Sequence, residues 1–207
     1  MTIAARKNRE KEALRRKIMD AARSLFVEHG YESVSMRKIA DAIDYSPTAI
    51  YLHFADKAAL IREICRDDFA ALAAAESKAS HVADPIERIR LTGLAYMRFG
   101  ARHPQQYRLM FMTPYHLPLQ EEDLQRKGDP ACDGYAALQR AVEEALAANR
   151  FRPEVTDVEL ICQTLWAGVH GATALQITMK DDPWFTFRSF EKRAALLLDV
   201  MLRGLCK

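Results

Sequence analysis

The sequence predicts an all-α protein, and three observations support this expectation. Apolar residues recur at three- and four-residue intervals along most of the chain, which is the spacing of one helix face. Residue pairs suited to starting a helix stand before several of these stretches, for example Ser46 with Pro47 and Asp84 with Pro85. The eight glycines and eight prolines are few for 207 residues, and no internal repeat or low-complexity tract is present. We therefore expect one or two domains built from helices.

The first long helix is expected from about Glu10 to His29, and Gly30 is expected to end it. The apolar stripe of this helix consists of Leu14, Ile18, Ala21, Ala22, Leu25 and Phe26. A basic arm leads into the helix, because eight Lys and Arg residues up to Arg23 face only three acidic residues. Such an arm suits contact with phosphate groups, and an ordinary solvated tail is the alternative.

Two short helices joined by a tight turn are expected between Ser35 and Lys57. Ser35 caps the first of them, which ends near Asp44. Ser46 caps the second, which runs from Pro47 to Phe54. This arrangement matches the helix-turn-helix unit, whose second helix enters the major groove of DNA. An ordinary helical hairpin has the same pattern and is the alternative.

The second short helix has two faces with different expected roles. Ile50 and Phe54 point inward, where they should close a three-helix core with Leu25, Phe26, Ile39 and Ile43. Thr48, Ala49 and Leu52 point outward, toward the bases. An exposed Leu52 is unfavourable on a packed hairpin, whereas in a groove its methyl groups could meet a thymine methyl.

Polar side chains around this outward face could contact DNA directly. Tyr51 and His53 lie on its flanks, where they could donate hydrogen bonds to phosphates, although His53 could equally be an ordinary exposed histidine. Lys57 and the unpaired N–H groups at the start of the next helix could hold another phosphate. Arg37 is the long side chain that could read a guanine. The candidate DNA-binding residues are Arg37, Ser46, Pro47, Thr48, Ala49, Tyr51, Leu52, His53 and Lys57.

The remaining chain is also expected to be helical, with one longer loop at Thr113 to Lys127, where two prolines and mixed charges occur. The expected helices run from Asp56 to about Ser80, from Asp84 to His103, from Tyr107 to Met112, from Pro130 to about Asn149, from a capping box at Thr156–Glu159 to about Met179, and from Ser189 to Arg203, which Gly204 ends.

Composition excludes several classes of protein. The net charge of +2 argues against a protein that coats any DNA by charge alone. An apolar signal segment and a run of about 18 apolar residues are both missing, so we expect a cytoplasmic protein with no membrane contact. Cys65, Cys132, Cys162 and Cys206 are widely separated, which predicts neither a zinc site nor a disulfide framework. We expect no cofactor and no metal.

The run from Arg16 to Ile64 resembles the DNA-binding domain of the tetracycline-repressor (TetR) family. The resemblance rests on AARSLFVEHGYESVSMRKIA, followed by AIYLHFADKAALI, and covers about a quarter of the chain. It implies an all-helical homodimer that binds a palindromic operator and releases it when a small molecule occupies the C-terminal domain. Residues 1–57 would then form the helix-turn-helix domain, and residues 58–207 the domain for effector binding and dimerisation. Many members have a polar aromatic residue or His at Leu52, where this chain departs.

The segment LWAGVHGATAL, from Leu165 to Leu175, resembles the W-x-x-x-H-G signature of one subgroup of C-terminal domains in this family. Trp166 and His170 lie on one helix face, and Gly171 would let a neighbouring helix approach. His170 could anchor a polar group of the effector, or it could be a hydrogen-bonded histidine of the core. The tentative effector-binding residues are Tyr96, Phe99, Tyr107, Met110, Phe111, Trp166 and His170; such aromatic and Met residues usually form core.

The last two helices have apolar residues on more than one face, which predicts a homodimer formed through them. We expect a ligand-responsive transcriptional regulator that binds double-stranded DNA, most simply a repressor released by a small and largely apolar effector. An architectural DNA-binding protein without an effector is one alternative. A helical enzyme is the other, although the sequence has no G-x-S-x-G, H-E-x-x-H, P-loop or G-x-G-x-x-G motif and no candidate catalytic residue.

Overall fold

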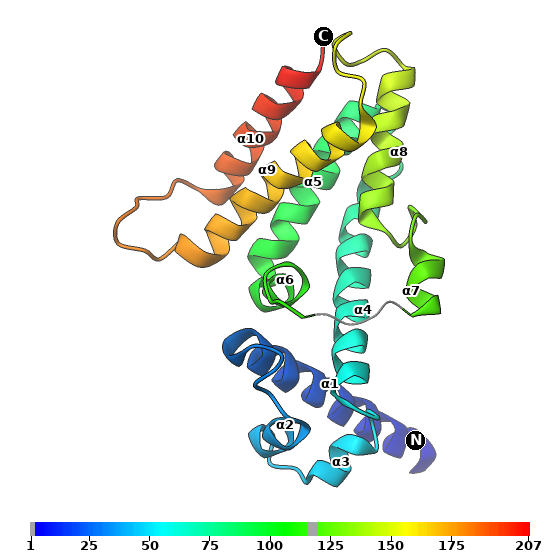
Figure 1. The fold of residues 1–207 in the computed structure, drawn as a ribbon, viewed down its shortest axis with the longest axis vertical. Helices are drawn as coiled ribbons and strands as arrows, with labels where there is room; N and C mark the ends of the chain where they lie inside the picture. The colour runs from blue at the N-terminus through cyan, green and yellow to red at the C-terminus, as the bar shows by residue number, and fades with distance from the viewer. Residues whose placement is uncertain (1–2, 116–119) are drawn as a thin grey trace. The chain divides into compact units, whose positions relative to one another are not determined.

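The computed structural model describes residues 3–115 and 120–207, and their regular structure is α-helical, which confirms the predicted fold class. Figure 1 shows the arrangement of the helices. The described residues also form a 3-10 turn and an isolated bridge between Phe151 and Cys206. The described helices are α1 (Ile3–His29), α2 (Met36–Ala42), α3 (Pro47–Tyr51), α4 (Lys57–Glu76), the 3-10 turn η1 (Ser77–Ala79), α5 (Pro85–Arg102), α6 (Pro104–Phe111), α7 (Glu121–Arg126), α8 (Gly134–Ala147), α9 (Val158–Met179) and α10 (Phe190–Leu205). None of them is long and apolar enough to cross a membrane.

The described residues form two compact units. Residues 3–69 and 105–115 belong to the N-terminal unit, and residues 70–104 and 120–207 belong to the C-terminal unit. Helix α4 therefore contributes its first part to one unit and its last turns to the other. The functional division expected at residue 57 stays a prediction.

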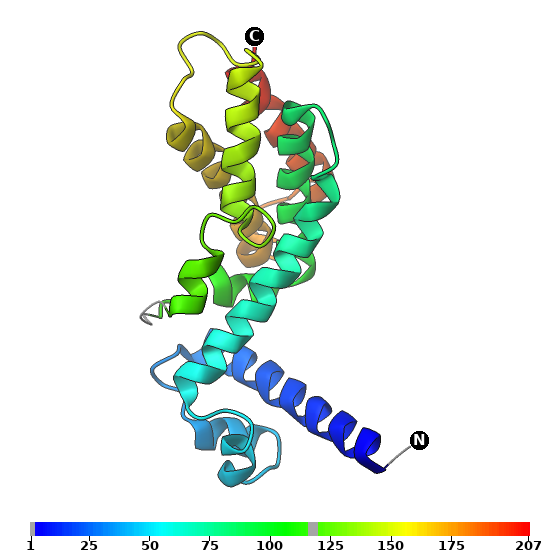
Figure 2. The ribbon, with the colours of Figure 1, turned by 90° about the vertical axis from the view of Figure 1, so that its right-hand side faces the viewer.

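The N-terminal unit is built around the three-helix core that the sequence predicts. Phe26 of α1, Ile39 of α2, Ile50 of α3 and Phe54 after it are buried in one cluster. In Figures 1 and 2 the short helices α2 and α3 lie side by side, and they contact each other directly. The same cluster includes Leu109 of α6, so a segment distant in sequence completes this core. The core fixes the orientation of α3.

In the C-terminal unit α5 is the central helix, because it packs against α8, α9 and α10. Glycines allow the closest approaches. A Cβ atom on Gly93 of α5 would lie 2.8 Å from Cδ2 of Leu198, and one on Gly168 of α9 would overlap Sδ of Met201. At Gly171, the glycine expected to admit a neighbouring helix, no described atom of the same chain lies within 4 Å of such a Cβ, so no helix of this chain approaches there.

The structure contains helix in two places where the sequence did not predict it. Helix α1 begins at Ile3 rather than Glu10, so the described part of the basic arm is helical, with an ion pair of 3.5 Å between Arg6 and Glu10. Helix α7 lies inside the stretch expected to be a loop, because Glu121–Arg126 consists of residues that tolerate helix well. Part of that stretch lies outside the described residues.

Four other helix ends differ from the predicted ones in their position or in the residue that caps them. Helix α8 begins after Asp133, whose carboxylate accepts the N–H groups of the first turn, and not at Pro130. Asp157 rather than Thr156 caps α9, at 3.0 Å from the N–H of Leu160. Helix α10 continues past Gly204, which lacks the positive φ of a terminating glycine. Helix α3 ends at Tyr51, earlier than predicted. Gly30, with φ 78°, ends α1 as expected.

Candidate nucleic-acid interface

Local hydrogen bonds fix the turn between α2 and α3. The Ser35 hydroxyl accepts the N–H of Lys38 at 3.1 Å, and the Ser46 hydroxyl accepts the N–H of Ala49 at 3.2 Å. Between the two caps Asp44 adopts φ 60°, a left-handed conformation that reverses the chain. Both serines therefore act as the sequence predicts, and they orient a short helix whose first residue is Pro47.

The predicted difference between the two faces of α3 is present in the structure. Ile50 is fully buried, whereas Leu52 is 77% exposed, and Thr48 and Tyr51 are also exposed. Ala49 is half-buried. The buried face carries the packing energy of α3, so the outward residues are available for a partner.

Two cations flank this face in different states. Arg37 on α2 is exposed and forms no ion pair or side-chain hydrogen bond within the part of the chain that the structure describes. Lys57, by contrast, donates to the Tyr31 carbonyl at 2.8 Å and lies 4.2 Å from the centre of the Tyr31 ring. Its ammonium group retains two further donors. Asp56 accepts the N–H of Ala59 at 2.6 Å, so part of the α4 N-terminus expected to bind phosphate is already occupied.

His53 is half-buried and its surroundings are positive. Its carbonyl accepts a hydrogen bond from Arg15 Nη1 at 2.9 Å. Burial, followed by the charges of Arg15 and Lys11, lowers the pKa of His53. The imidazole is therefore neutral near pH 7 and keeps one N–H donor. Arg15 also pairs with Glu63 and lies 4.4 Å from the Phe54 ring centre, a contact that sequence reasoning missed because the partners lie far apart in sequence.

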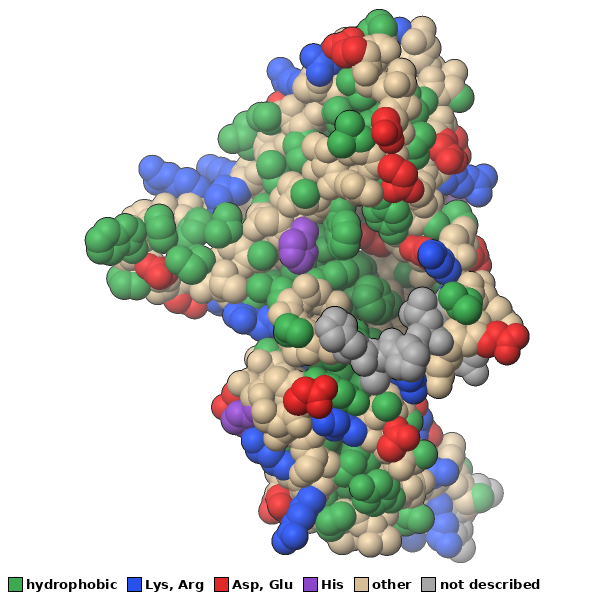
Figure 3. Space-filling model, viewed as in Figure 1, with side chains coloured by type: hydrophobic (Ala, Val, Ile, Leu, Met, Phe, Trp, Pro, Cys, Tyr) green, Lys and Arg blue, Asp and Glu red, His purple; other side chains and the backbone are tan. Residues whose placement is uncertain are grey.

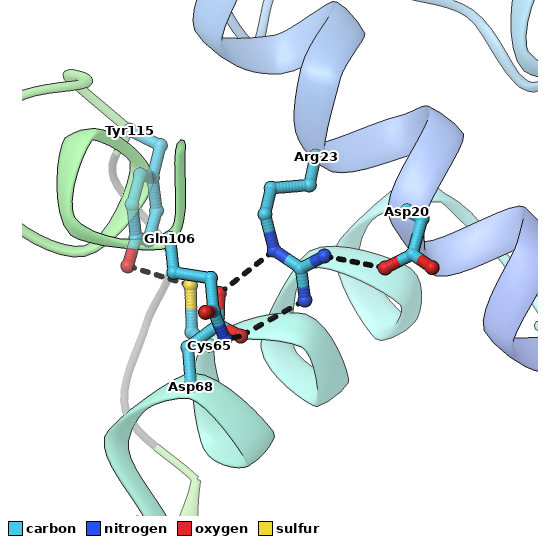
Figure 4. Close-up of polar contacts among 6 residues, drawn as sticks. All are labelled: Asp20, Arg23, Cys65, Asp68, Gln106 and Tyr115. Atoms are coloured by element: carbon cyan, nitrogen blue, oxygen red, sulfur yellow. Dashed lines mark hydrogen bonds and ion pairs between the residues drawn. The ribbon is translucent and has the colours of Figure 1, made fainter. Parts of the chain in front are cut away.

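A second polar network in the N-terminal unit is centred on Asp68 of α4, which is 1% exposed (Figure 4). Its carboxylate accepts Arg23 Nε at 3.0 Å, Arg23 Nη2 at 2.9 Å and Gln106 Nε2 at 2.7 Å. Close by, the Cys65 thiol lies 3.0 Å from the Tyr115 hydroxyl, and burial raises the pKa of Cys65 to about 11. Asp68 thus ties α1, α4 and α6 together, a role that helical periodicity alone does not reveal.

Among the tentative effector-binding residues, three in the C-terminal unit come together. The Trp166 Nε1–H group donates to the Tyr96 hydroxyl at 3.1 Å, and that hydroxyl lies 3.4 Å from His170 Nδ1. The indole and imidazole ring centres are 6.2 Å apart. Burial lowers the pKa of His170. Phe99 belongs to the same unit, where its ring packs 4.9 Å from that of His103.

The other three tentative residues, Tyr107, Met110 and Phe111, belong to the N-terminal unit. Tyr107 is buried there, and the Phe111 ring centre lies 4.9 Å from that of Tyr107 and 5.6 Å from that of Phe69. The expected residues therefore form two groups in separate units. A single pocket made by both groups stays a prediction.

Comparisons with curated proteins point to one class. Over 66 residues the chain is 42% identical to Rv1474c, an HTH-type transcriptional repressor of Mycobacterium tuberculosis. The matched stretch covers 32% of this chain and 35% of the relative. Over 101 residues it is 33% identical to the HTH-type transcriptional regulator UidR of Escherichia coli, covering 45% of this chain and 48% of the relative. The matches thus span about a third to a half of the length of these relatives.

Solved structures extend the likeness over nearly the whole chain. A TetR family transcription regulator from Marinobacter aquaeolei has a TM-score of 0.74 at 18% identity, covering 98% of this chain and 99% of its own, which shows a shared fold. The TetR family regulator PfmR from Thermus thermophilus has a TM-score of 0.69 at 26% identity, and the match covers 92% of this chain and 99% of PfmR.

Two family models account for most of the sequence. Residues 18–64 match the model of bacterial regulatory proteins of the tetR family, and these residues include α2, α3 and the start of α4. Residues 89–201 match the model of the tetracyclin repressor-like C-terminal domain, which is more than half of the chain. This protein therefore belongs to the TetR family of bacterial regulatory proteins.

Proposed function

We propose that this protein is a homodimeric transcriptional repressor that binds an operator in double-stranded DNA and releases it when a small molecule binds the C-terminal unit. The observation that carries this proposal is α3, a short helix capped by Ser46, buried on one side through Ile50 and exposed on the other. Family membership and the named repressors among its relatives support a regulator over an enzyme.

In this proposal the exposed residues of α3 enter the major groove. Thr48, Ala49 and Leu52 meet base edges, and Leu52 supplies an apolar surface that suits a thymine methyl group. Arg37 reads a guanine, since its guanidinium is exposed and not engaged by a neighbour in the described structure. The start of α3 at Ser46 and Pro47 approaches the backbone closely.

Three further residues position the protein on the phosphates. Tyr51 is exposed beside the base-reading residues and donates through its hydroxyl group. His53 donates as a neutral imidazole, because its pKa is lowered. Lys57 is held in place by the Tyr31 carbonyl and contributes its remaining N–H donors.

The outer faces of α9 and α10 support dimerisation. Both helices expose large apolar side chains, namely Leu160 and Leu175 on α9 and Leu196 and Val200 on α10. Trp184 and Phe185 extend this apolar surface along the loop between the helices, where Figure 3 shows hydrophobic side chains gathered. A second copy related by two-fold symmetry would cover the surface and bring two α3 helices to half-sites about 34–36 Å apart or a multiple of it.

The effector is proposed to bind near Tyr96, Trp166 and His170, in the segment that resembles the W-x-x-x-H-G signature of one subgroup. The hydrogen bonds among these side chains fit a polar anchor in an otherwise apolar wall, and equally a histidine of the core. A folded His170→Gln variant separates the two roles. Weakened effector binding assigns His170 to the pocket, and unchanged binding assigns it to the core.

Helix α4 is the proposed route of communication, because one continuous helix supplies residues to both units. A change at its last turns would reach Asp68, and through Asp68 the side chains of Arg23 and Gln106. Linkage requires that operator binding weakens effector binding by the same factor by which the effector weakens operator binding.

The test of this function is selection of genomic fragments by the purified full-length protein at physiological salt, followed by sequencing. We expect enrichment of one inverted repeat. Fragments without a common sequence would favour an architectural protein, and a protein that retains no DNA would contradict the proposal.

A further inference from the structure

Glu76, the last residue of α4, has a buried carboxyl group for which the described part of the chain supplies no hydrogen bond or ion pair. Its side chain is 9% exposed, and its Oε2 atom is buried and receives no hydrogen bond within the described structure. Burying a charge without a partner is costly, and native structures rarely keep such a group. An unpaired buried acid therefore requires an explanation that packing alone does not supply.

The first turn of α8 lies against this carboxyl group. Gly134 is in direct contact, because a Cβ atom there would overlap Glu76 Oε2. Asp133 caps this turn and accepts the N–H groups of Tyr135 at 3.0 Å and of Ala136 at 3.2 Å, so these two donors are already engaged. The missing side chain at Gly134 leaves room for the carboxyl group of Glu76.

The electrostatic surroundings of Glu76 are negative. Asp133 is the charged neighbour that acts on it, and neither acid forms an ion pair within the described residues. Burial and the Asp133 charge raise the pKa of Glu76 to about 8. At pH 7 the free protein therefore holds a proton on Glu76, in a place where a positive charge would be favourable.

We propose that the carboxylate of Glu76, backed by Asp133, binds the ammonium group of an amine ligand that has an apolar body. The inference rests on the proposed function, because it names the chemical class of the effector. Leu72 lies one turn before Glu76 on the same side of α4 and is buried, so the immediate surroundings are apolar. Figure 3 shows a hollow in this face of the molecule with hydrophobic side chains inside and both acidic and basic ones at its edge.

The proton balance of this step gives it a direct signature. A ligand that arrives as an ammonium ion pairs with an ionised Glu76, so the proton held by the free protein is released to the solvent. Near pH 7 each bound amine should release up to one proton. Calorimetric titrations in two buffers of different ionisation enthalpy measure that number.

The experiment uses the full-length protein and a matched pair of probes, 4-phenylbutylamine and 4-phenylbutanol, in isothermal titration calorimetry. We expect the amine to bind on the order of tenfold more tightly than the alcohol. Glu76→Gln should remove the preference and the proton release together. Equal binding of the two probes, no binding of the amine at millimolar concentration, or an unchanged preference in Glu76→Gln would overturn the proposal.

Two more variants guard against a folding artefact. Gly134→Ala keeps both charges but displaces the carboxyl group, so amine affinity should fall while the helical circular dichroism signal is retained. Glu143→Gln removes an exposed glutamate of α8, the helix that begins at Gly134, and should leave the amine preference intact. No DNA enters these titrations, so a failed amine test leaves operator binding standing, and a failed operator selection leaves the amine preference measurable.

Discussion

Helix α4 carries two buried carboxyl groups that differ in their partners. Asp68 belongs to the N-terminal unit and accepts three hydrogen bonds from Arg23 and Gln106. Glu76 belongs to the C-terminal unit and its Oε2 atom accepts none within the described structure. Both groups are nearly inaccessible, with exposed fractions of 1% and 9%. Burial is therefore common to both, and the supply of donors distinguishes them.

This difference indicates separate roles for the two parts of α4 that belong to different units. A paired buried carboxylate holds its neighbours in one arrangement, because moving any partner leaves a charge unpaired. An unpaired carboxyl group is destabilising in the free protein and gains a partner when a cation arrives. Asp68 is therefore suited to keeping the N-terminal unit rigid, and Glu76 to responding to a ligand.

The largest expected effect comes from breaking the paired site. Asp68→Ala leaves the partly buried Arg23 guanidinium with the exposed Asp20 as its one carboxylate partner among the described residues, so we expect the free energy of unfolding to fall by about 3–5 kcal/mol. Urea denaturation followed by circular dichroism measures this loss. Asp20→Ala is the control and should cost less than about 1 kcal/mol. Similar losses in both variants would show that Asp68 is no structural centre.

The unpaired carboxyl group of Glu76 should make the stability of the protein depend on pH. The folded-state pKa of Glu76, about 8, lies above its ordinary value of 4.5, so the folded protein binds this proton more tightly than the unfolded chain does. Stability is thus lost as pH rises from about 4.5 to about 8, and Glu76→Gln should avoid that loss. We expect the variant to become more stable than the parent by about 4 kcal/mol at pH 8. A difference that does not change with pH would contradict the unpaired state.

The contrast between a free and an engaged side chain recurs at the surface proposed to face DNA, where Arg37 forms no ion pair or side-chain hydrogen bond within the described residues. Arg37→Ala should weaken operator binding by about 1–3 kcal/mol and relax the preference at one base pair. Fluorescence anisotropy with an operator and its single-base variants measures both effects. Equal losses on operator and random DNA would remove its base-reading role.

Lys57 is the engaged cation of this pair and should have the smallest effect. Lys57→Ala should weaken binding to all sequences alike and reduce the slope of log affinity against log salt by about one. Titrations at several salt concentrations on operator and random DNA test this expectation. An unchanged slope would mean that the bond to the Tyr31 carbonyl keeps the ammonium from DNA.

Features set by local sequence were predictable. The serine caps, the buried faces of Ile39 and Ile50, and the glycine that ends α1 all depend on residues within a few positions of one another. One error arose where two neighbouring residues, Thr156 and Asp157, could each cap the same helix. Another arose at Gly204, which was expected to end α10, although the helix continues to Leu205.

Features set by distant partners were not predictable from one sequence. Asp67 and Asp68 are neighbours in α4, yet only Asp68 is buried, because Arg23 and Gln106 meet it from other helices. The burial of Glu76 could not be predicted for the same reason, because its neighbours Asp133 and Gly134 are distant in sequence. The assignment of Tyr107 and Phe111 to the N-terminal unit likewise depends on tertiary packing.

The most direct test of sequence-specific, two-fold DNA reading compares three DNA duplexes at physiological salt: the selected inverted repeat, one half-site with its partner half scrambled, and a fully scrambled duplex. Our expectation is that the full-length protein binds the intact repeat most tightly, with affinity at least about a thousandfold above that for scrambled DNA. Equal affinity for the repeat and the scrambled duplex would contradict it.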